Sequence, residues 1–300
     1  MPQKTCIVVV GPTAVGKTSL AIALAQHYNT AIISADSRQC FKELHIGVAK
    51  PTEQQLQQVK HYFINSHSIT EDVNAGSFEQ YALQAADEIF SQHDIAIMAG
   101  GTGLYVKAFC EGMDLIPSAD IALRNIITNL YNEQGIEWLQ QQIRDKDPEW
   151  YAVGEIQNPQ RMMRALEVVM QTGKSILSFQ QAVKAERNFR IIKVGLNLPR
   201  AALYHNINTR VDEMIDAGLE DEVRALLPYR NRNALQTVGY REIFECIDGL
   251  VDRNTAITNI KTNTRHYAKR QLTWFAKDSA INWFSPLDYS QLIKYFNNLV

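Results

Sequence analysis

The stretch Gly11-Pro12-Thr13-Ala14-Val15-Gly16-Lys17-Thr18 decides the fold of this chain. It follows the apolar run 5–10 and opens a helix-forming stretch that reaches His27, so the pattern G-x-x-x-x-G-K-[ST] has the strand–loop–helix context of a phosphate loop. The glycines let successive backbone N–H groups point at one anion. The helix N-terminus and Lys17 add positive charge, and the Thr18 hydroxyl is a ligand for magnesium. The stretch therefore predicts a site for a diphosphate or triphosphate.

Apolar, β-rich runs alternate with helical patterns on either side of this loop. Alternation of this kind is typical of a parallel sheet covered by helices. We therefore predict an α/β fold, with a P-loop-type, mostly parallel sheet and helices on both faces. The expected strands are 5–10, 31–34, 61–66, 94–99, 189–198 and 280–284, and the expected helices are 17–27, 53–60, 77–91, 202–217, 219–226, 240–247 and 255–275.

Between Pro117 and residue 188 the pattern is helical only. Helices are expected at 122–132, 136–143, 159–171 and 176–185, punctuated by Asp-Pro and Asn-Pro pairs. The prediction is an α/β catalytic core, residues 1–116 and 189–300, interrupted by an all-helical insert domain, residues 117–188.

The composition is that of a globular protein, with 46% hydrophobic and 21% charged residues among 300. No apolar run approaches the roughly 20 residues of a membrane span, so no membrane association is expected. The four cysteines form no C-x-x-C pair, which disfavours both a zinc site and a disulfide framework. A cytoplasmic location, in a reducing environment, is the expectation.

The net charge of −2 disfavours a general nucleic-acid coat protein, but two zones, 161–193 and 261–277, are basic. In the second zone Lys261, Arg265 and Lys269 are four residues apart and form one stripe on a helix. Such a stripe neutralises a phosphate backbone, or it is the solvent-facing side of a helix.

Two further segments follow predicted strands and should border the phosphate loop. Asp36 ends the second strand, where a carboxylate accepts a proton, holds magnesium or caps a turn. The segment 99–105 ends the fourth strand with three glycines, which we interpret as allowing close approach of a ligand. Thr102 is its polar side chain, and the missing carboxylate disfavours simple ATP hydrolysis. Lys50 lies in a predicted loop ahead of a helix, where it either binds an anion or is an ordinary surface lysine.

Blocks across nearly the whole chain resemble the bacterial tRNA dimethylallyltransferases, also called tRNA isopentenyltransferases. The resemblance implies transfer of a dimethylallyl group from dimethylallyl diphosphate to N6 of the adenosine just 3′ of the anticodon (tRNA position 37). It also implies Mg²⁺ dependence, release of diphosphate and binding of the anticodon stem-loop. The matching blocks, in family order, are residues 11–18, 36–39, 47–51, 99–105, 158–166, 238–242 and 265–275.

The resemblance also implies a role for individual residues. The phosphate loop would hold the donor diphosphate, with Lys17 neutralising the leaving group and Thr18 positioning the metal. Asp36 matches the general base that accepts the N6 proton, Arg210 matches a family arginine near the donor diphosphate, and Thr102, also expected in the catalytic set, matches a position that touches the tRNA. The expected tRNA-binding set is Asp36, Ser37, Arg38, Gln39, Thr102, Arg124, Gln160, Arg161, Met162, Met163 and Arg164, with Lys261, Arg265 and Lys269 from the basic stripe.

The chain departs modestly from the family pattern, with Val48 where a threonine is common and a segment 60–63 that lacks a usual His-His pair. Three alternatives stay open: a small-molecule kinase that uses ATP, a prenyltransferase for free AMP or ADP, and a non-enzymatic RNA-binding module. The basic zones disfavour the second, and the intact phosphate loop disfavours the third. Nothing in the sequence demands more than a monomer.

Overall fold

The computed structural model describes residues 3–118, 120–180 and 184–297. They form two compact units, one of Met1–Gly112 with Glu186–Val300 and one of Met113–Ala185. The second unit ends before the predicted limit of 188 because Arg187 belongs to the first. Its guanidinium donates to the Ala108 and Phe109 carbonyls at 2.9 and 2.8 Å and pairs with Glu79 at 2.7 Å.

A six-stranded sheet forms the centre of the first unit, with the strand order β3-β2-β4-β1-β5-β6. Every strand pairing in it is parallel. All six residues of β1 are buried, as expected for a strand with a neighbour on each side. The predicted sheet is confirmed, with strands β1 (Thr5–Val10), β2 (Ile32–Ser34), β3 (His61–Tyr62), β4 (Ile95–Gly100), β5 (Arg190–Leu196) and β6 (Asn282–Phe284).

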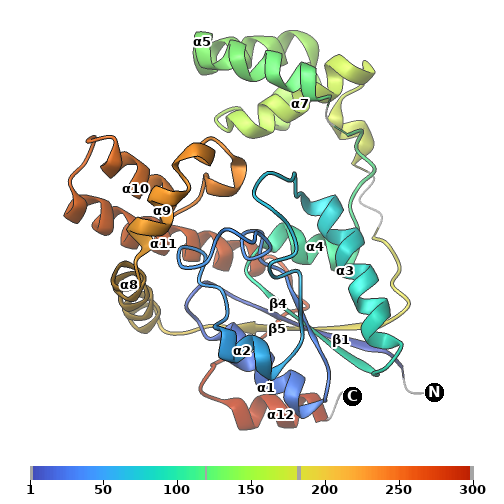
Figure 1. Ribbon diagram of the computed structural model, residues 1–300. Helices are drawn as coiled ribbons and strands as arrows, with labels where there is room; N and C mark the ends of the chain where they lie inside the picture. The colour runs from blue at the N-terminus through green and yellow to red at the C-terminus, as the bar shows by residue number, and fades with distance from the viewer. Residues whose placement is uncertain (1–2, 119, 181–183, 298–300) are drawn as a thin grey trace. The chain divides into compact units, whose positions relative to one another are not determined.

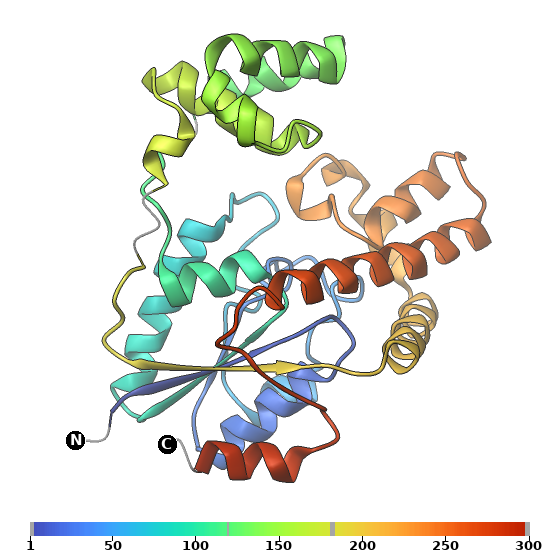
Figure 2. The ribbon, with the colours of Figure 1, turned by 180° about the vertical axis from the view of Figure 1, so that it is seen from behind.

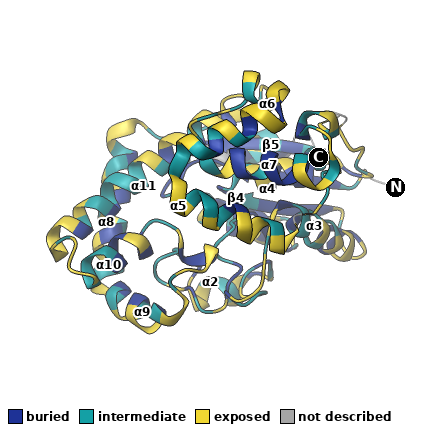
Figure 3. Ribbon diagram, turned by 90° about the horizontal axis from the view of Figure 1, so that it is seen from above, coloured by how far each residue is buried: buried dark blue, intermediate teal, exposed yellow. Residues whose placement is uncertain are grey.

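Helices cover both faces of this sheet (Figures 1 and 2). Helices α1 (Lys17–His27) and α12 (Tyr289–Asn297) lie on one face. Helices α3 (Ala75–Phe90) and α4 (Gly103–Glu111) lie on the other, with α11 (Arg253–Phe275) running beside α4. Figure 3 shows the result: buried residues are concentrated on the strands, and exposed residues on the outer sides of the helices.

Two of the remaining helices of this unit begin at recognisable caps. Thr52 and Gln55 form a capping box at the start of α2. Gly239, which has φ +97°, precedes α10 and donates its N–H to Glu242 at 2.8 Å. The remaining helices are α2 (Glu53–Gln58), α8 (Arg200–Asp216), α9 (Leu219–Ala225) and α10 (Tyr240–Ile247), with short 3-10 turns at Leu227–Tyr229 and Asn233–Leu235.

The second unit contains only helices among its described regular elements. Gly135 has φ 77° and ψ −169°, so it divides α5 into two helical segments, as the separate patterns at 122–132 and 136–143 predicted. Asp147 and Asn158 cap α6 and α7, each followed by proline at the first position. The elements are α5 (Ile121–Lys146), α6 (Pro148–Val153), α7 (Pro159–Thr172) and the 3-10 turn Ile176–Phe179.

Two predicted elements are wrong in extent. The expected strand 61–66 stops at Tyr62, because Phe63 and Asn65 have φ of 63° and 53° and turn the chain out of the strand. The expected helix 176–185 is only a 3-10 turn that ends at Phe179. Residues 181–183 of that prediction lie outside the described residues. Helices α4, α6 and α12 were not predicted.

Within residues 3–118, 120–180 and 184–297, no helix is both long enough and apolar enough to cross a lipid bilayer.

The turn from β4 into α4 packs against protein at each of its glycines. A Cβ on Gly100 would lie 2.2 Å from the Ala35 carbonyl oxygen, which is backbone and cannot move aside. A Cβ on Gly101 would lie 2.2 Å from Gln271 Nε2, and one on Gly103 would lie 2.2 Å from the Trp274 ring. The structure thus gives these glycines packing partners inside the protein, in place of the ligand that we expected.

We predict that Gly100→Ala destabilises the first unit by about 1–3 kcal/mol, because the new methyl group would force β2 and β4 apart at their ends. The control is Gly76→Ala in α3, whose nearest neighbour would be the Asn74 side-chain oxygen at 3.3 Å. Chemical denaturation measures both. Equal unfolding free energies for the two variants would contradict this account of the turn.

Candidate active site

The phosphate loop connects β1 to α1 and is shaped by backbone that favours glycine. Gly11 and Gly16 have φ of +141° and +102°, and a Cβ on Gly11 would lie 2.6 Å from the Leu196 carbonyl oxygen of β5. Gly16 is the N-cap of α1 and offers no side-chain acceptor, so the first N–H groups of α1 suit an anion. Lys17 Nζ donates to the Pro12 carbonyl at 2.6 Å, which holds the ammonium over the loop.

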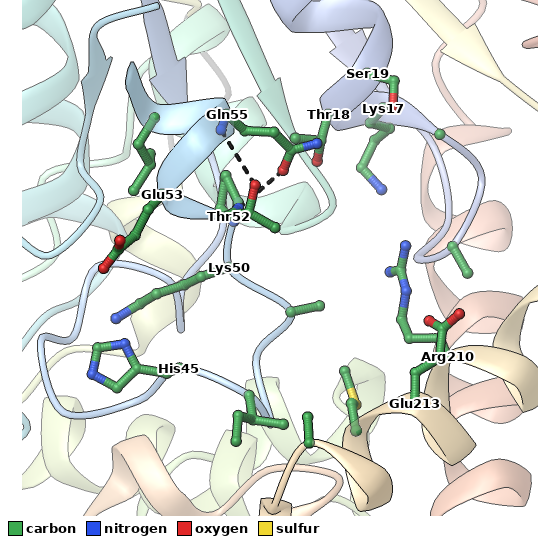
Figure 4. Close-up of a pocket in the computed structure, with 18 of the residues that line it drawn as sticks. Lys17, Thr18, Ser19, His45, Lys50, Thr52, Glu53, Gln55, Arg210 and Glu213 are labelled. Carbon is green, nitrogen blue, oxygen red and sulfur yellow. Dashed lines mark hydrogen bonds between the residues drawn. The ribbon is translucent and has the colours of Figure 1, made fainter. Parts of the chain in front are cut away.

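This loop borders a cleft of about 720 Å³, which we call the phosphate cleft. Figure 4 shows Lys17 and Arg210 pointing toward each other, while Lys50 points away from both, toward His45. Thr18 also lines the cleft, and Arg210 lies 3.4 Å from the Thr13 hydroxyl. Two cations, one from the phosphate loop and one from α8, thus face the same space.

The charges in the phosphate cleft favour an anion. Burial lowers the pKa of Lys17 to about 8; the Asp36 charge opposes this shift, and the Arg210 charge adds to it. Burial also lowers the pKa of Arg210. Both groups would therefore be stabilised in their charged forms by a bound anion. Lys50, whose pKa burial lowers to about 8, donates to the Phe41 carbonyl and Asn65, each at 2.5 Å.

A narrower space of about 120 Å³, the central cavity, adjoins the phosphate cleft and shares Ala49, Arg210 and Met214 with it. Asp36 lies in its wall, at the carboxyl end of β2. Asp36 Oδ1 accepts the Arg38 N–H at 2.9 Å and the Gln39 N–H at 3.3 Å, so its carboxylate also caps a turn. Much of the wall is apolar, with Val48, Ile207, Val211, Met214, Val238 and Ile260.

A third space of about 460 Å³, the outer pocket, continues from the central cavity and shares Arg38, Thr237, Val238 and Tyr267 with it. Its wall is polar and cationic, since Arg38, Arg241 and Arg270 contribute to it. The Arg270 guanidinium lies 5.8 Å from the centre of the Tyr267 ring. Helical spacing had singled out the Lys261–Lys269 side of α11, which left Arg270 and Tyr267 outside the predicted site. Arg241 lies on α10 and was also not among the predicted site residues.

Thr102 joins the two loops that surround Asp36. Its hydroxyl accepts the Ser37 N–H at 3.0 Å and lies 3.3 Å from the Ser37 hydroxyl. Thr102 also interacts with the Tyr267 hydroxyl, whose pKa is raised to about 12 by burial and by the Asp36 charge. The predicted Ser37, Arg38 and Gln39 all follow Asp36 in the same turn. The structure therefore gathers Asp36–Gln39, Thr102, Lys17 and Arg210 around adjoining spaces.

The basic stripe of α11 is largely used within the protein. Lys261 pairs with Asp212 of α8 at 2.6 Å, and Arg265 donates to Asn208 of α8 at 2.9 Å. Only Lys269 of the predicted three is well exposed. Lys261 and Arg265 therefore connect α11 to α8, and the expectation that this stripe binds RNA stays a prediction.

Most predicted RNA-binding side chains of the second unit also have structural partners. Arg124 makes two hydrogen bonds to the buried Glu167, at 2.6 and 2.8 Å. Arg164 lies 3.2 Å from Glu167 and donates to the Pro117 carbonyl at 2.6 Å. Arg161 pairs with Glu155.

Three further predictions concern the start of α7 and the segment before α5. The Met162 and Met163 side chains are buried in the core of the second unit, whereas Gln160 is exposed, and RNA binding by this segment stays a prediction. Ala119, within the predicted helical insert, lies outside the described residues.

No cluster of three or more His, Cys, Asp or Glu side chains that would hold a metal exists in the described part of the chain. The Thr18 hydroxyl, together with oxygens of a bound diphosphate, fits the preference of Mg²⁺ for few protein ligands and substrate phosphates. The site thus fits a metal that arrives with its anion.

Comparisons with known proteins agree on one family. Residues 39–278 match the family model described as IPP transferase. The tRNA dimethylallyltransferase of Cytophaga hutchinsonii is 52% identical over 293 residues, which cover 98% of this chain and 96% of that protein. The tRNA dimethylallyltransferase 1 of Bacteroides thetaiotaomicron is 43% identical over 291 residues, covering 97% of this chain and 94% of that protein.

Solved structures give the same result over nearly the whole chain. The full-length tRNA isopentenylpyrophosphate transferase of Bacillus halodurans superposes with a TM-score of 0.72 at 33% identity, covering 99% of this chain and 95% of that one. A eukaryotic dimethylallyltransferase acting on tRNA superposes with a TM-score of 0.78 at 25% identity, covering 96% of this chain and 75% of that one. The chain therefore belongs to the IPP transferase family, as its relatives among the tRNA dimethylallyltransferases do.

Proposed function

We propose that this chain transfers a dimethylallyl group from dimethylallyl diphosphate to N6 of the tRNA adenosine just 3′ of the anticodon, with release of diphosphate. The observation that carries this proposal is the order of the three adjoining spaces. A cationic phosphate cleft is followed by a largely apolar cavity that contains Asp36, and then by a polar, cationic outer pocket. That order suits a charged leaving group, a hydrocarbon and an RNA base.

The donor diphosphate would bind the phosphate loop, where Lys17, Arg210 and the first N–H groups of α1 stabilise negative charge as it grows on the leaving oxygens. Bound Mg²⁺, held by Thr18 and the diphosphate, would supply further neutralisation of the leaving group. The apolar walls of the central cavity, among them Val48 and Val211, would surround the five-carbon group.

The adenosine would enter from the outer pocket, because a base must leave its stack to reach an enclosed site. Its N6 attacks C1 of the donor as the C1–O bond breaks, and the bonding electrons leave with the diphosphate. Asp36, in the wall of the central cavity, then accepts the N6 proton. Arg38, Arg241 and Arg270 in the outer pocket would contact RNA phosphates. The helical unit, with Arg124, Gln160, Arg161 and Arg164, is proposed as a second RNA-binding surface.

The ATP-dependent kinase is not favoured. The family and the named relatives are prenyltransferases of tRNA. The carboxyl end of β4 also carries Ala99 and Gly100, without the carboxylate that helps to hold magnesium in many nucleoside triphosphatases. All residues of the proposed reaction come from one chain, so we propose that a monomer acts in the cytoplasm, where tRNA is modified.

The direct test is nucleoside mass analysis of unmodified tRNA after incubation with the protein, dimethylallyl diphosphate and Mg²⁺. The expected result is one added five-carbon unit on the adenosine next to the anticodon. Unmodified tRNA, together with phosphate transfer from labelled ATP to a small molecule in a parallel reaction, would overturn the proposal.

We predict that Asp36→Asn lowers kcat by about 10²–10⁴-fold, the usual scale of general-base loss. The amide keeps an oxygen that accepts the Arg38 and Gln39 N–H groups, so the turn and the affinity for tRNA should persist. Single-turnover transfer and filter binding measure the two quantities. A full-rate Asp36→Asn enzyme would remove Asp36 as the base.

We predict that Lys17→Ala lowers kcat by about 10²–10³-fold and weakens donor binding, because a charge on the leaving diphosphate is left unpaired. Thr52→Ala is a matched control, since Thr52 also lines the phosphate cleft but caps α2. Diphosphate release at the wild-type rate from the Lys17 variant would show that the anion binds elsewhere.

Because the pKa of Lys17 is lowered to about 8, its ammonium is present below that pH and lost above it. We therefore predict that kcat/KM for the donor falls as the pH rises through about 8, and that Lys17→Arg moves the fall to higher pH. An unchanged profile in that variant would assign the titration to another group, for which Lys50 in the same cleft is suited.

A further inference from the structure

One carboxylate, Glu222 of α9, binds three successive backbone N–H groups of the loop 45–50. Its Oε2 accepts from His45 at 3.2 Å and from Ile46 at 2.8 Å, and its Oε1 accepts from Gly47 at 3.1 Å. Hydrogen bonds to an ionised acceptor are stronger than neutral ones, so this is a firm anchor for the loop.

The loop 45–50 forms a wall of two of the spaces described above. His45, Ile46, Ala49 and Lys50 line the phosphate cleft, and Gly47, Val48 and Ala49 line the central cavity. The position of this backbone therefore sets the boundary between the place of the diphosphate and the place of the hydrocarbon.

Tyr240 of α10 contacts both Glu222 and the loop 45–50. It is fully buried, and its hydroxyl lies 2.5 Å from Glu222 Oε1. Its ring touches Gly47 so closely that a Cβ there would lie 2.6 Å from the ring. The glycine lets the loop lie flat on the ring, while the hydroxyl orients the carboxylate toward the loop. The block 238–242, which carries Tyr240, thereby gains a role that the predicted site did not give it.

The opposite side of the loop is bound to the segment that holds the proposed base. Gln39 Nε2 donates to the Val48 and Ala49 carbonyls at 3.3 and 3.1 Å. The Gln39 N–H donates to Asp36 Oδ1 at 3.3 Å. A continuous set of hydrogen bonds thus runs from Glu222 through the loop 45–50 and Gln39 to Asp36.

We propose that Glu222, oriented by Tyr240, is a positioning residue for prenyl transfer: it fixes the loop 45–50 so that the central cavity stays closed to water around the dimethylallyl group. This inference rests on the proposed function. Glutamine at this position keeps one acceptor oxygen and puts an NH₂ donor in place of the other, so either the Gly47 N–H or the His45 and Ile46 N–H groups lose their acceptor and the loop relaxes. Water then takes the place of the adenine amine at C1: the C1–O bond breaks, diphosphate leaves, and dimethylallyl alcohol forms as the water proton passes to solvent.

The experiment compares Glu222→Gln with Glu220→Gln, a control on the same helix whose carboxylate pairs with Arg253 at 2.7 Å outside the loop. Diphosphate release and prenyl transfer to tRNA are measured in the same reaction, with the melting temperature of each variant. For Glu222→Gln we expect a loss of about 10- to 100-fold in kcat/KM for the donor, and more than one diphosphate released per prenyl group transferred. Glu220→Gln should retain wild-type values.

Tyr240→Phe keeps the ring under Gly47 and removes only the hydroxyl, so it tests the same role should Glu222→Gln fail to fold. It should show the same change in the ratio of diphosphate to prenyl groups, to a smaller degree. A ratio of one in every folded variant, with donor kcat/KM equal to that of Glu220→Gln, would overturn the positioning role alone. Wild-type enzyme that transfers no prenyl group would overturn the proposed function instead.

Discussion

The repulsion between Lys17 and Arg210 is the constraint on which the rest of the site depends. Both cations are partly buried and face one cleft, and burial and mutual repulsion lower the pKa of Lys17. Such a pair is stable only if something else in the protein holds it in place. The phosphate loop does so on one side, through the Pro12 carbonyl, and α8 does so on the other, from which Arg210 reaches Thr13. A bound anion would offset this repulsion, and the neighbouring spaces decide which anion fits.

Close backbone packing at the carboxyl edge of the sheet brings the second group of residues to this cleft. Because all strands are parallel, their carboxyl ends meet at one edge, and Gly100 lets β4 lie directly against Ala35. Thr102 and Asp36 consequently become neighbours through Ser37. A side chain at position 100 would separate these groups, so the glycines after β4 serve the site by allowing the protein to pack upon itself.

Much of this arrangement could be predicted from the sequence, and the failures have a common physical cause. The phosphate loop and the position of Asp36 follow from a local motif and from the order of the strands, and both can be predicted from one sequence. For the basic stripe of α11, helical spacing tells which side chains share a face but not which residues of other helices they contact. Those partners are Asp212 and Asn208 of α8, about fifty residues earlier in the chain.

The same limit explains the second unit and the outer pocket. Met162 and Met163 lie in a matching segment, but only the packing of α5 against α7 shows that their side chains are core. Arg124 and Arg164 converge on Glu167, which is buried and therefore needs their charge. In the outer pocket, Arg38, Arg241 and Arg270 come from three separate segments, and no periodicity joins them.

The order of the three spaces, from cationic to apolar to polar, also explains why no carboxylate is needed at the end of β4. Phosphoryl transfer requires a metal that neutralises charge on the phosphate being transferred, whereas prenyl transfer breaks a carbon–oxygen bond and leaves the diphosphate intact. The protein then needs only to stabilise charge at one end and to exclude water at the other. In the proposed reaction, Lys17 and Arg210 would meet the first requirement, and the apolar wall of the central cavity would meet the second. A phosphate loop without an acidic residue on β4 is consistent with these two requirements, since the carbon–oxygen bond that breaks would lie at the border between a cationic and an apolar environment.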